Sequence, residues 1–200
     1  MKPLHKLLCI LFAIGGGYAQ AQMAHLILDS QPGDYIGQGM SYDITYTPQN
    51  SYYFSPQVRR TLPSGEPAEL LFVLGLGPSA PFALLFFGTD QLGIPMQPGF
   101  YPDAERADFA SPGHPGLDVS FDHRGCNTLT GNFTVTEFTY SSSLGIQSFS
   151  ASFEQHCEGA APALFGTFTF QAVPEPSAVG LFILALGARG LLLRRKPTRI

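Results

Sequence analysis

The chain of 200 residues contains no tryptophan and only three cysteines. Its central part, residues 22–172, also has no lysine, and its four arginines face fourteen carboxylates, which gives a formal net charge of −10. Because clustered lysine and arginine bind phosphate backbones, this acidic composition disfavours a nucleic-acid partner. Neutral or cationic glycans and divalent cations remain compatible with it.

The motifs of several common enzyme classes are missing as well. Residues 22–172 contain no G-x-S-x-G nucleophile elbow, no phosphate-binding loop, no H-E-x-x-H helix and no EF-hand loop. No stretch of ten or more of these residues repeats apolar side chains every 3.6 positions, so long amphipathic helices are not expected. Because these catalytic motifs are missing, we expect a protein that is not an enzyme.

What the central part does contain is phenylalanine, tyrosine, threonine, serine, glycine and proline, a composition that favours strands and turns. Its length of about 150 residues suits one domain with one hydrophobic core. Seven or more short strands of this kind predict an all-β fold, a single antiparallel β-sandwich, with a jelly roll as one form of it.

Three segments in the first half of this domain carry specific expectations. Residues 70–76 and 82–87 are continuous apolar runs divided by a Gly/Pro-containing linker, which predicts two buried strands joined by a tight loop. Residues 40–46 alternate and predict a half-buried strand. Its inner face would hold Met40, Tyr42, Ile44 and Tyr46. Residues 92–115 are rich in proline and glycine and show little periodicity, and within them residues 97–102 predict an ordered aromatic loop.

The last third of the domain predicts a hairpin and a third strand. Residues 133–140 and 146–153 are strand-like and are separated by a five-residue loop of hairpin length. A further strand is expected at residues 164–170. One face of that strand would hold Leu164, Gly166, Phe168 and Phe170.

The hairpin register brings the two cysteines of the domain close together. If Tyr140 faces Ile146, then Cys126 lies opposite position 160, near Cys157, and a small bulge would allow a bridge. An even number of cysteines also favours a disulfide over reactive thiols if the chain is exported, and residues 1–21 have the layout of a secretory signal peptide. It would close a loop of about 32 residues, and the chain-entropy model gives roughly 3.7 kcal/mol for such a loop. Two separate buried thiols are the alternative.

Ionisable side chains surround both cysteines and form the main candidate for chemistry. They are Asp118, Asp122, His123, Arg124, Glu154, His156 and Glu158. With the disulfide formed, the carboxylates could supply the pair that a glycoside hydrolase needs. The two cysteines with the two histidines could alternatively hold a metal, although the usual Cys-x-x-Cys spacing is absent. The simpler reading is a set of solvated charges beside a disulfide, with Asp118 and Asp122 on the outer face of a strand.

Two further sets of residues are candidates for binding. Tyr52, Tyr53, Phe100 and Tyr101 are the aromatic candidates for a ligand surface, in the absence of tryptophan. Packing in the core of a sandwich is the alternative for such residues. Asp29, Asp34 and Asp43 lie in a glycine-rich segment and could donate oxygens to a structural calcium ion. An ordinary turn, which favours Asp, explains the same segment. We expect no other cofactor.

The N-terminus has the layout of a secretory signal peptide, residues 1–21. Lys2 and Lys6 precede an apolar core at residues 7–17, and Ala19 and Ala21 form a small-x-small cleavage site. Cleavage after the second alanine would leave a domain that spans residues 22–172.

The C-terminal residues 173–200 contain three features in a fixed order. Pro174, Glu175 and Pro176 come first, an apolar stretch at 178–193 follows, and Arg194, Arg195 and Lys196 come next. The apolar stretch is shorter than the roughly 20 residues of an ordinary membrane helix. Its basic end is expected to stay in the cytoplasm.

Together these features resemble the PEP-CTERM sorting signal of Gram-negative bacteria that make exopolysaccharide. The resemblance covers residues 173–200 only. It implies that an exosortase-type membrane peptidase recognises the Pro-Glu-Pro triplet after transient anchoring of the 178–193 helix in the inner membrane. It further implies release or re-anchoring of the domain at the cell surface or in the extracellular matrix.

The function that follows is a structural or binding role associated with exopolysaccharide and biofilm. Two alternatives stay open: a carbohydrate-active hydrolase that uses the carboxylates near the disulfide, and a calcium-dependent adhesin that uses the Asp29 to Asp43 segment.

Overall fold

The computed structural model describes residues 20–77 and 80–174. Within them, residues 22–173 form one compact unit. The predicted signal peptide, apart from its last two residues, lies outside the described residues, as do Glu175, Pro176, the 178–193 helix and the basic residues after it. No helix in the described part of the chain is long and apolar enough to cross a membrane.

The described residues are nearly all in strands or turns, so the all-β expectation is confirmed. The strands are β1 (Gln20–Ser30), β2 (Ser41–Tyr46), β3 (Tyr53–Thr61), β4 (Pro67–Gly75), β5 (Ala83–Gly88), β6 (Gly99–Arg106), β7 (Gly116–Phe121), β8 (Leu129–Ser141), β9 (Gly145–Cys157) and β10 (Leu164–Pro174). Two single turns of 3₁₀-helix, η1 (Asp90–Leu92) and η2 (Ala107–Phe109), follow β5 and β6.

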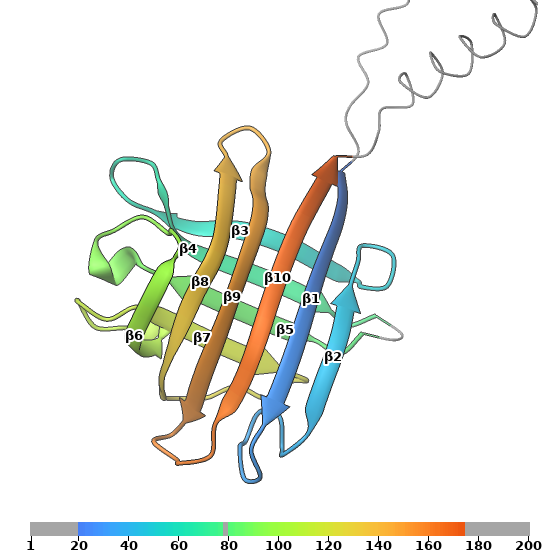
Figure 1. The fold of residues 1–200 in the computed structure, drawn as a ribbon, viewed down its shortest axis with the longest axis vertical. Coiled ribbons are helices and arrows are strands. Elements are labelled where there is room, and N and C mark those ends of the chain that lie inside the picture. The colour runs from blue at the N-terminus through green and yellow to red at the C-terminus, as the bar shows by residue number, and fades with distance from the viewer. Residues whose placement is uncertain (1–19, 78–79, 175–200) are drawn as a thin grey trace, which may run out of the picture. The chain divides into compact units, whose positions relative to one another are not determined.

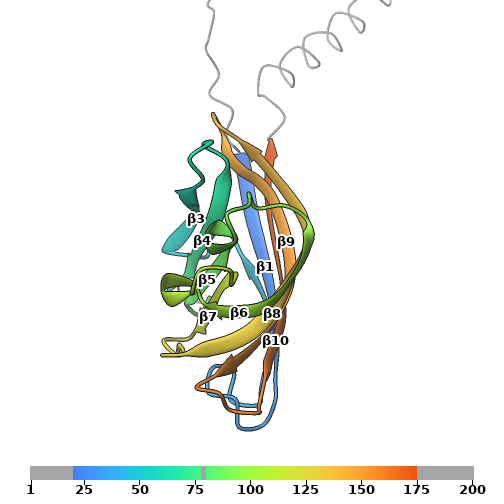
Figure 2. The same cartoon turned by 90° about the vertical axis from the view of Figure 1, so that its left-hand side faces the viewer.

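All ten strands belong to one sheet, in the order β2-β1-β10-β9-β8-β6-β7-β5-β4-β3. The sheet bends between β6 and β7 until its two halves face each other, with β3, β4, β5 and β7 crossing behind β8, β9, β10 and β1 (Figures 1 and 2). β6 and β7 run parallel, whereas β8 and β9 and the β3-β4-β5 group are antiparallel.

This arrangement corrects the expected antiparallel sandwich. The domain has two facing layers, but they are halves of one mixed sheet and not two separate sheets. Alternation along a strand shows which face is buried but does not identify its neighbours, because those come from distant parts of the chain.

The core between the layers is built mainly from phenylalanine. The ring of Phe72 on β4 lies 5.3 Å from that of Phe149 on β9 and 4.7 Å from that of Phe168 on β10. Phe87 on β5 packs on Phe133 of β8, with ring centroids 5.4 Å apart. Such pairs add to the gain from burying large apolar surfaces, so the aromatic contacts between the layers stabilise the fold of the sheet onto itself.

The two apolar runs of the sequence form β4 and β5, which pair from Glu69 with Gly88 to Leu74 with Ala83. The expected inner face of β10 is also confirmed, with Gly166 partly buried and Leu164, Phe168 and Phe170 fully buried. In β2 the alternation holds from Tyr42 to Tyr46.

Two local expectations are wrong. Met40 lies before β2 and is exposed, because its backbone N–H donates to Gly37 within a turn. The aromatic loop expected at residues 97–102 is mostly strand, because residues 99–106 form β6 and pair with β8. The register of this pairing shifts between Tyr101 and Ala104, and the strand accommodates Pro102 at that irregularity.

The predicted hairpin is confirmed as β8 and β9, and Tyr140 pairs with Ile146 as expected. Two irregularities, near residues 136 and 147, cancel, so Leu129 at the far end still pairs with Cys157 in the same register. The disulfide between Cys126 and Cys157 is present, with their Cα atoms 5.0 Å apart. It joins the segment between β7 and β8 to the end of β9.

At the bend of the sheet the strand pairing stops early, and a side chain binds the backbone groups that have no strand partner there among the described residues. β6 pairs with β7 only at Glu105–Gly116 and Arg106–Leu117. Two residues further along β7, the N–H of Val119 donates to Oε1 of Gln155 at 2.8 Å, and Nε2 of Gln155 donates to the Val119 carbonyl at 2.9 Å. Gln155 is fully buried and extends from β9, so its amide takes the place of a strand at this point.

Replacing Gln155 by leucine should therefore destabilise the domain strongly. The change leaves the N–H and C=O of Val119 buried without partners, at about 1–3 kcal/mol each. We expect Gln155→Leu to lower the free energy of unfolding by about 2–5 kcal/mol in urea denaturation of the oxidised protein.

The matched control is Gln171→Leu on the exposed side of β10. That change should stay within about 0.5 kcal/mol of the parent, as is usual for surface positions. Equal effects of the two substitutions would contradict a bridging role for Gln155.

Candidate functional site

The sequence predicts that Asp118 is exposed to solvent, but the structure buries it. The alternation in β7 is as expected, with Leu117 and Val119 in the core, but the carboxylate of Asp118 is covered by Arg106, whose Nε lies 3.1 Å from its Oδ2. Burial raises the pKa of Asp118, and the hydrogen bond and charge of Arg106 oppose that rise. Asp118 therefore has a structural role, as the buried partner of Arg106 in an ion pair.

The next residues form a turn outside the core. Asp122 and His123 adopt positive φ angles of 47° and 65°. The ring of His123 stacks on Phe82 at 5.8 Å. Arg124 lies 3.3 Å from Asp122 and donates from Nε to the carbonyl of Ile36 at 2.8 Å.

Glu158 caps the chain beside the disulfide. Its Oε1 accepts from the backbone N–H of Asn127 at 2.5 Å, and its Oε2 accepts from Oγ1 of Thr128 at 3.1 Å. The backbone hydrogen bond from Asn127 is the main reason that the pKa of Glu158 lies below its ordinary value.

Glu154 lies on the outer face of β9, between two hydrogen-bonding neighbours. Nε2 of His156 lies 3.0 Å from its Oε1, and Nδ2 of Asn132 donates to its Oε2 at 3.2 Å. These two contacts, that of His156 first, lower the pKa of Glu154.

The predicted ionisable cluster is therefore divided among separate structural contacts. In the described residues, no hydrogen bond or ion pair joins Asp118 or Asp122 to Glu154 or Glu158. Nor do the described residues contain a group of three or more His, Cys, Asp or Glu side chains placed to hold a metal ion. The two cysteines are joined to each other.

The three calcium candidates also have separate contacts. Asp34 is buried and accepts from Oγ of Ser30 at 2.8 Å and from the Gly37 N–H at 2.7 Å, which are the contacts of a structured turn. Asp29 accepts from Oγ of Ser41, and the Asp43 carboxylate lies 2.6 Å from Nε2 of His25.

The aromatic candidates differ among themselves. Tyr52, Tyr53 and Phe100 are 76%, 54% and 61% exposed, as a binding surface requires. Tyr101 is a core residue instead: it is 4% exposed, stacks on Phe133 at 4.8 Å and donates its hydroxyl to the carbonyl of Gln97. Alternation along β6 places one residue of the Phe100–Tyr101 pair outside and the other inside.

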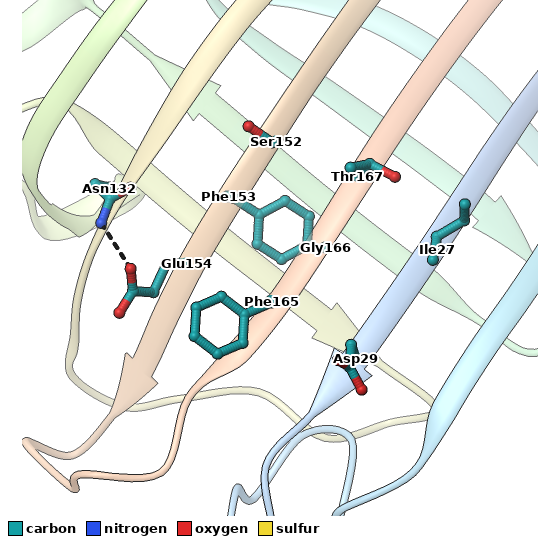
Figure 3. A pocket seen from close by; sticks show the side chains of 9 residues that line it. All are labelled: Ile27, Asp29, Asn132, Ser152, Phe153, Glu154, Phe165, Gly166 and Thr167. Carbon is teal, nitrogen blue, oxygen red and sulfur yellow. Dashed lines mark hydrogen bonds between the residues drawn. The ribbon is translucent and has the colours of Figure 1, made fainter.

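An open groove of about 370 Å³ lies over the outer face of β8, β9, β10 and β1. Figure 3 labels the residues that line it, which are Ile27, Asp29, Asn132, Ser152, Phe153, Glu154, Phe165, Gly166 and Thr167. Its volume is at the lower end of the range of small-ligand sites, about 300–1,000 Å³. This groove is the candidate functional site.

The sequence indicates some of the groove residues but not the groove. Phe165 alternates with the core residue Leu164, so its outward position follows from the predicted strand. The residues around Phe165 in the groove could not be predicted, because they depend on which strands are neighbours. Gly166 pairs with Phe153, and a side chain on Gly166 would lie 2.7 Å from Cε1 of that ring and 2.9 Å from the Ile27 carbonyl. Glycine is therefore needed here for the close packing beneath the groove.

Comparisons with protein-family models, with curated proteins and with solved structures found no match to this chain. The site is consequently characterised by its own geometry.

The cap made by Glu158 gives a prediction for pH. Because the pKa of Glu158 is lower in the folded protein than its ordinary value of 4.5, its contribution to stability is present above that value and is lost as the pH falls through the folded pKa. We expect Glu158→Gln to lower the melting temperature at pH 7, and this difference from the parent should shrink as the pH falls below about 4.5.

Glu137→Gln is the control, because Glu137 is exposed on β8 and its carboxylate makes no hydrogen bond or ion pair in the described part of the chain. A melting difference for Glu158→Gln that stays constant from pH 7 to pH 2.5 would contradict the capping role of its charge.

Proposed function

We propose that this protein is exported and sorted to the cell surface or extracellular matrix of a Gram-negative bacterium, where it binds exopolysaccharide or has a structural role in the matrix without catalysis. In this proposal residues 1–21 are removed as a signal peptide. Residues 173–200 are the sorting signal that an exosortase-type membrane peptidase processes, after transient anchoring of the 178–193 helix in the inner membrane.

The tail is the observation that carries the location. Pro174, Glu175 and Pro176, the apolar stretch and Arg194 to Lys196 occur in the order of the PEP-CTERM signal. The disulfide is consistent with this location, because disulfides persist in oxidising compartments outside the cytoplasm.

The domain itself supports a binding role. All four of its arginines are held in ion pairs with carboxylates: Arg59 and Arg60 contact Glu69 and Asp108, Arg106 contacts Asp118, and Arg124 contacts Asp122. The remaining acidic side chains leave the domain strongly negative, which suits neutral or cationic partners. The groove on the outer face offers a place for such a partner.

Hydrolysis is the weaker proposal. A glycosidase needs two carboxylates about 5–9.5 Å apart, one of them with a raised pKa. The only carboxylate near the disulfide with a raised pKa, within the described residues, is Asp118, and Arg106 covers it. Glu154 and Glu158 have lowered pKa values and bind neighbouring groups.

The proposal predicts that Glu175→Ala will keep the protein in the inner-membrane fraction. The parent chain, expressed in its own host, should instead be recovered at the cell surface or with the extracellular exopolysaccharide. Fractionation followed by immunoblotting measures this difference, with Glu137→Ala as the control for removing a carboxylate elsewhere in the chain.

The same matrix fraction should be assayed for released sugar. Parent protein that co-purifies with polysaccharide and releases none supports the proposal. Identical fractionation of the parent and Glu175→Ala would contradict the sorting step, and sugar release by the parent would contradict the non-catalytic role.

A further inference from the structure

We propose that the groove over β8, β9, β10 and β1 binds a neutral or cationic glycan chain, with Phe165 as the surface on which a sugar ring stacks. This inference rests on the proposed function and names its binding site. The groove was not indicated by the aromatic residues that the sequence singles out, since none of them lines it.

The groove residues form a row across the strands. Asn132 pairs with Glu154 in the β8–β9 register, and Glu154 pairs with Phe165 in the β9–β10 register. Figure 3 shows Asp29 on β1 continuing this row beyond Phe165. At about 4.8 Å between strands, four strands span roughly 14 Å, which is the scale of a short oligosaccharide and longer than a single sugar ring.

Two apolar side chains that line the groove are exposed. Phe165 is 38% exposed and Ile27 is 39% exposed. The face of an aromatic ring is electron-rich and packs well against the C–H bonds on the apolar face of a sugar ring. An outward phenylalanine flanked by carboxylates and hydroxyls provides both the apolar and the polar contacts that such a ring requires.

The polar groups around Phe165 are already held in place. Glu154 is positioned by Asn132 and His156, and Asp29 accepts from Oγ of Ser41 at 3.0 Å. Each carboxylate retains lone pairs for further hydroxyl donors. Because these side chains are fixed before a ligand arrives, binding would cost little side-chain entropy.

The charge of the groove decides between classes of glycan. Asp29 and Glu154 are its charged lining residues, and no lysine or arginine lines it. The lowered pKa of Glu154 keeps this carboxylate ionised at neutral pH. A uronic acid or a phosphate group would be repelled here, whereas hydroxyls and amines would find acceptors.

The test measures binding of the full chain to exopolysaccharide purified from its host and to cellohexaose as a defined neutral glycan, by isothermal titration calorimetry. Phe165→Ala should weaken binding at least about tenfold, because it removes most of a large apolar contact. Phe165→Tyr should bind like the parent, because it keeps the ring. Phe109→Ala removes a phenylalanine that is more exposed (71%) and lies outside the groove, so it is the matched control and should also bind like the parent.

A second variant tests the charge of the groove. Glu154→Gln keeps the shape of the side chain but removes its charge and replaces one acceptor oxygen with an NH₂ donor. The ratio of affinities for an oligogalacturonate and for cellohexaose should rise in this variant, by about tenfold. Melting curves of each variant confirm that it is folded.

The outcomes are distinguishable. Parent affinity in Phe165→Ala, or weakening by Phe109→Ala alone, would overturn the groove as the site and leave the matrix-binding role intact. An unchanged ratio in Glu154→Gln would overturn the charge selectivity. Failure of the parent to bind the host exopolysaccharide would overturn both this inference and the binding role on which it rests.

Discussion

In the described part of the chain, strand pairing joins the two layers of the domain at only two residue pairs of β6 and β7. The rest of the structure depends on how the gap beyond these pairs is closed. Gln155 closes it by binding both backbone groups of Val119 from the opposite layer. The disulfide lies beside this contact, and Nε2 of Gln155 is 3.3 Å from Sγ of Cys126. One buried amide and one covalent bond thus hold the fold of the sheet where the strand ladder stops.

Closure of the sheet determines what each outer face presents. With the phenylalanine core between the layers, the opposite side of β8, β9, β10 and β1 faces solvent. The register of these strands places Asn132, Glu154 and Phe165 in one row. The groove is a consequence of that register. A shift of the β9–β10 pairing by one residue would move Phe165 into the core and remove the aromatic ring from the groove.

Much of the local structure could be predicted from the sequence because it depends on near neighbours. The short turn between β8 and β9 fixes their register, and that register brings Cys126 near Cys157. The strict alternation of β10 identifies its buried face. In each case the relevant partner is close in sequence or follows from the period of a strand.

Features that depend on distant partners could not be predicted. From the sequence alone Gln155 is an ordinary polar residue in a strand, and its role depends on Val119 of β7, which is distant in sequence. Asp118 is predicted to be exposed because the sequence does not show that Arg106 covers it. The proline-rich segment that forms β6 has an irregular register with β8, so its pattern hid the strand and with it the buried position of Tyr101. The position of Phe165 in a groove could not be predicted for the same reason, because its neighbours there come from β1, β8 and β9.

Hydrogen exchange of the Val119 amide, followed by NMR in the oxidised protein, tests the closure of the sheet most directly. The amide lies beyond the last β6–β7 pair, and its protection depends on Gln155. Protection comparable to that of the Leu85 amide, on the adjoining core strand β5, is the predicted result, since both amides should exchange only when the domain opens. Exchange as fast as that of a surface turn would contradict the claim that this side chain joins the two layers.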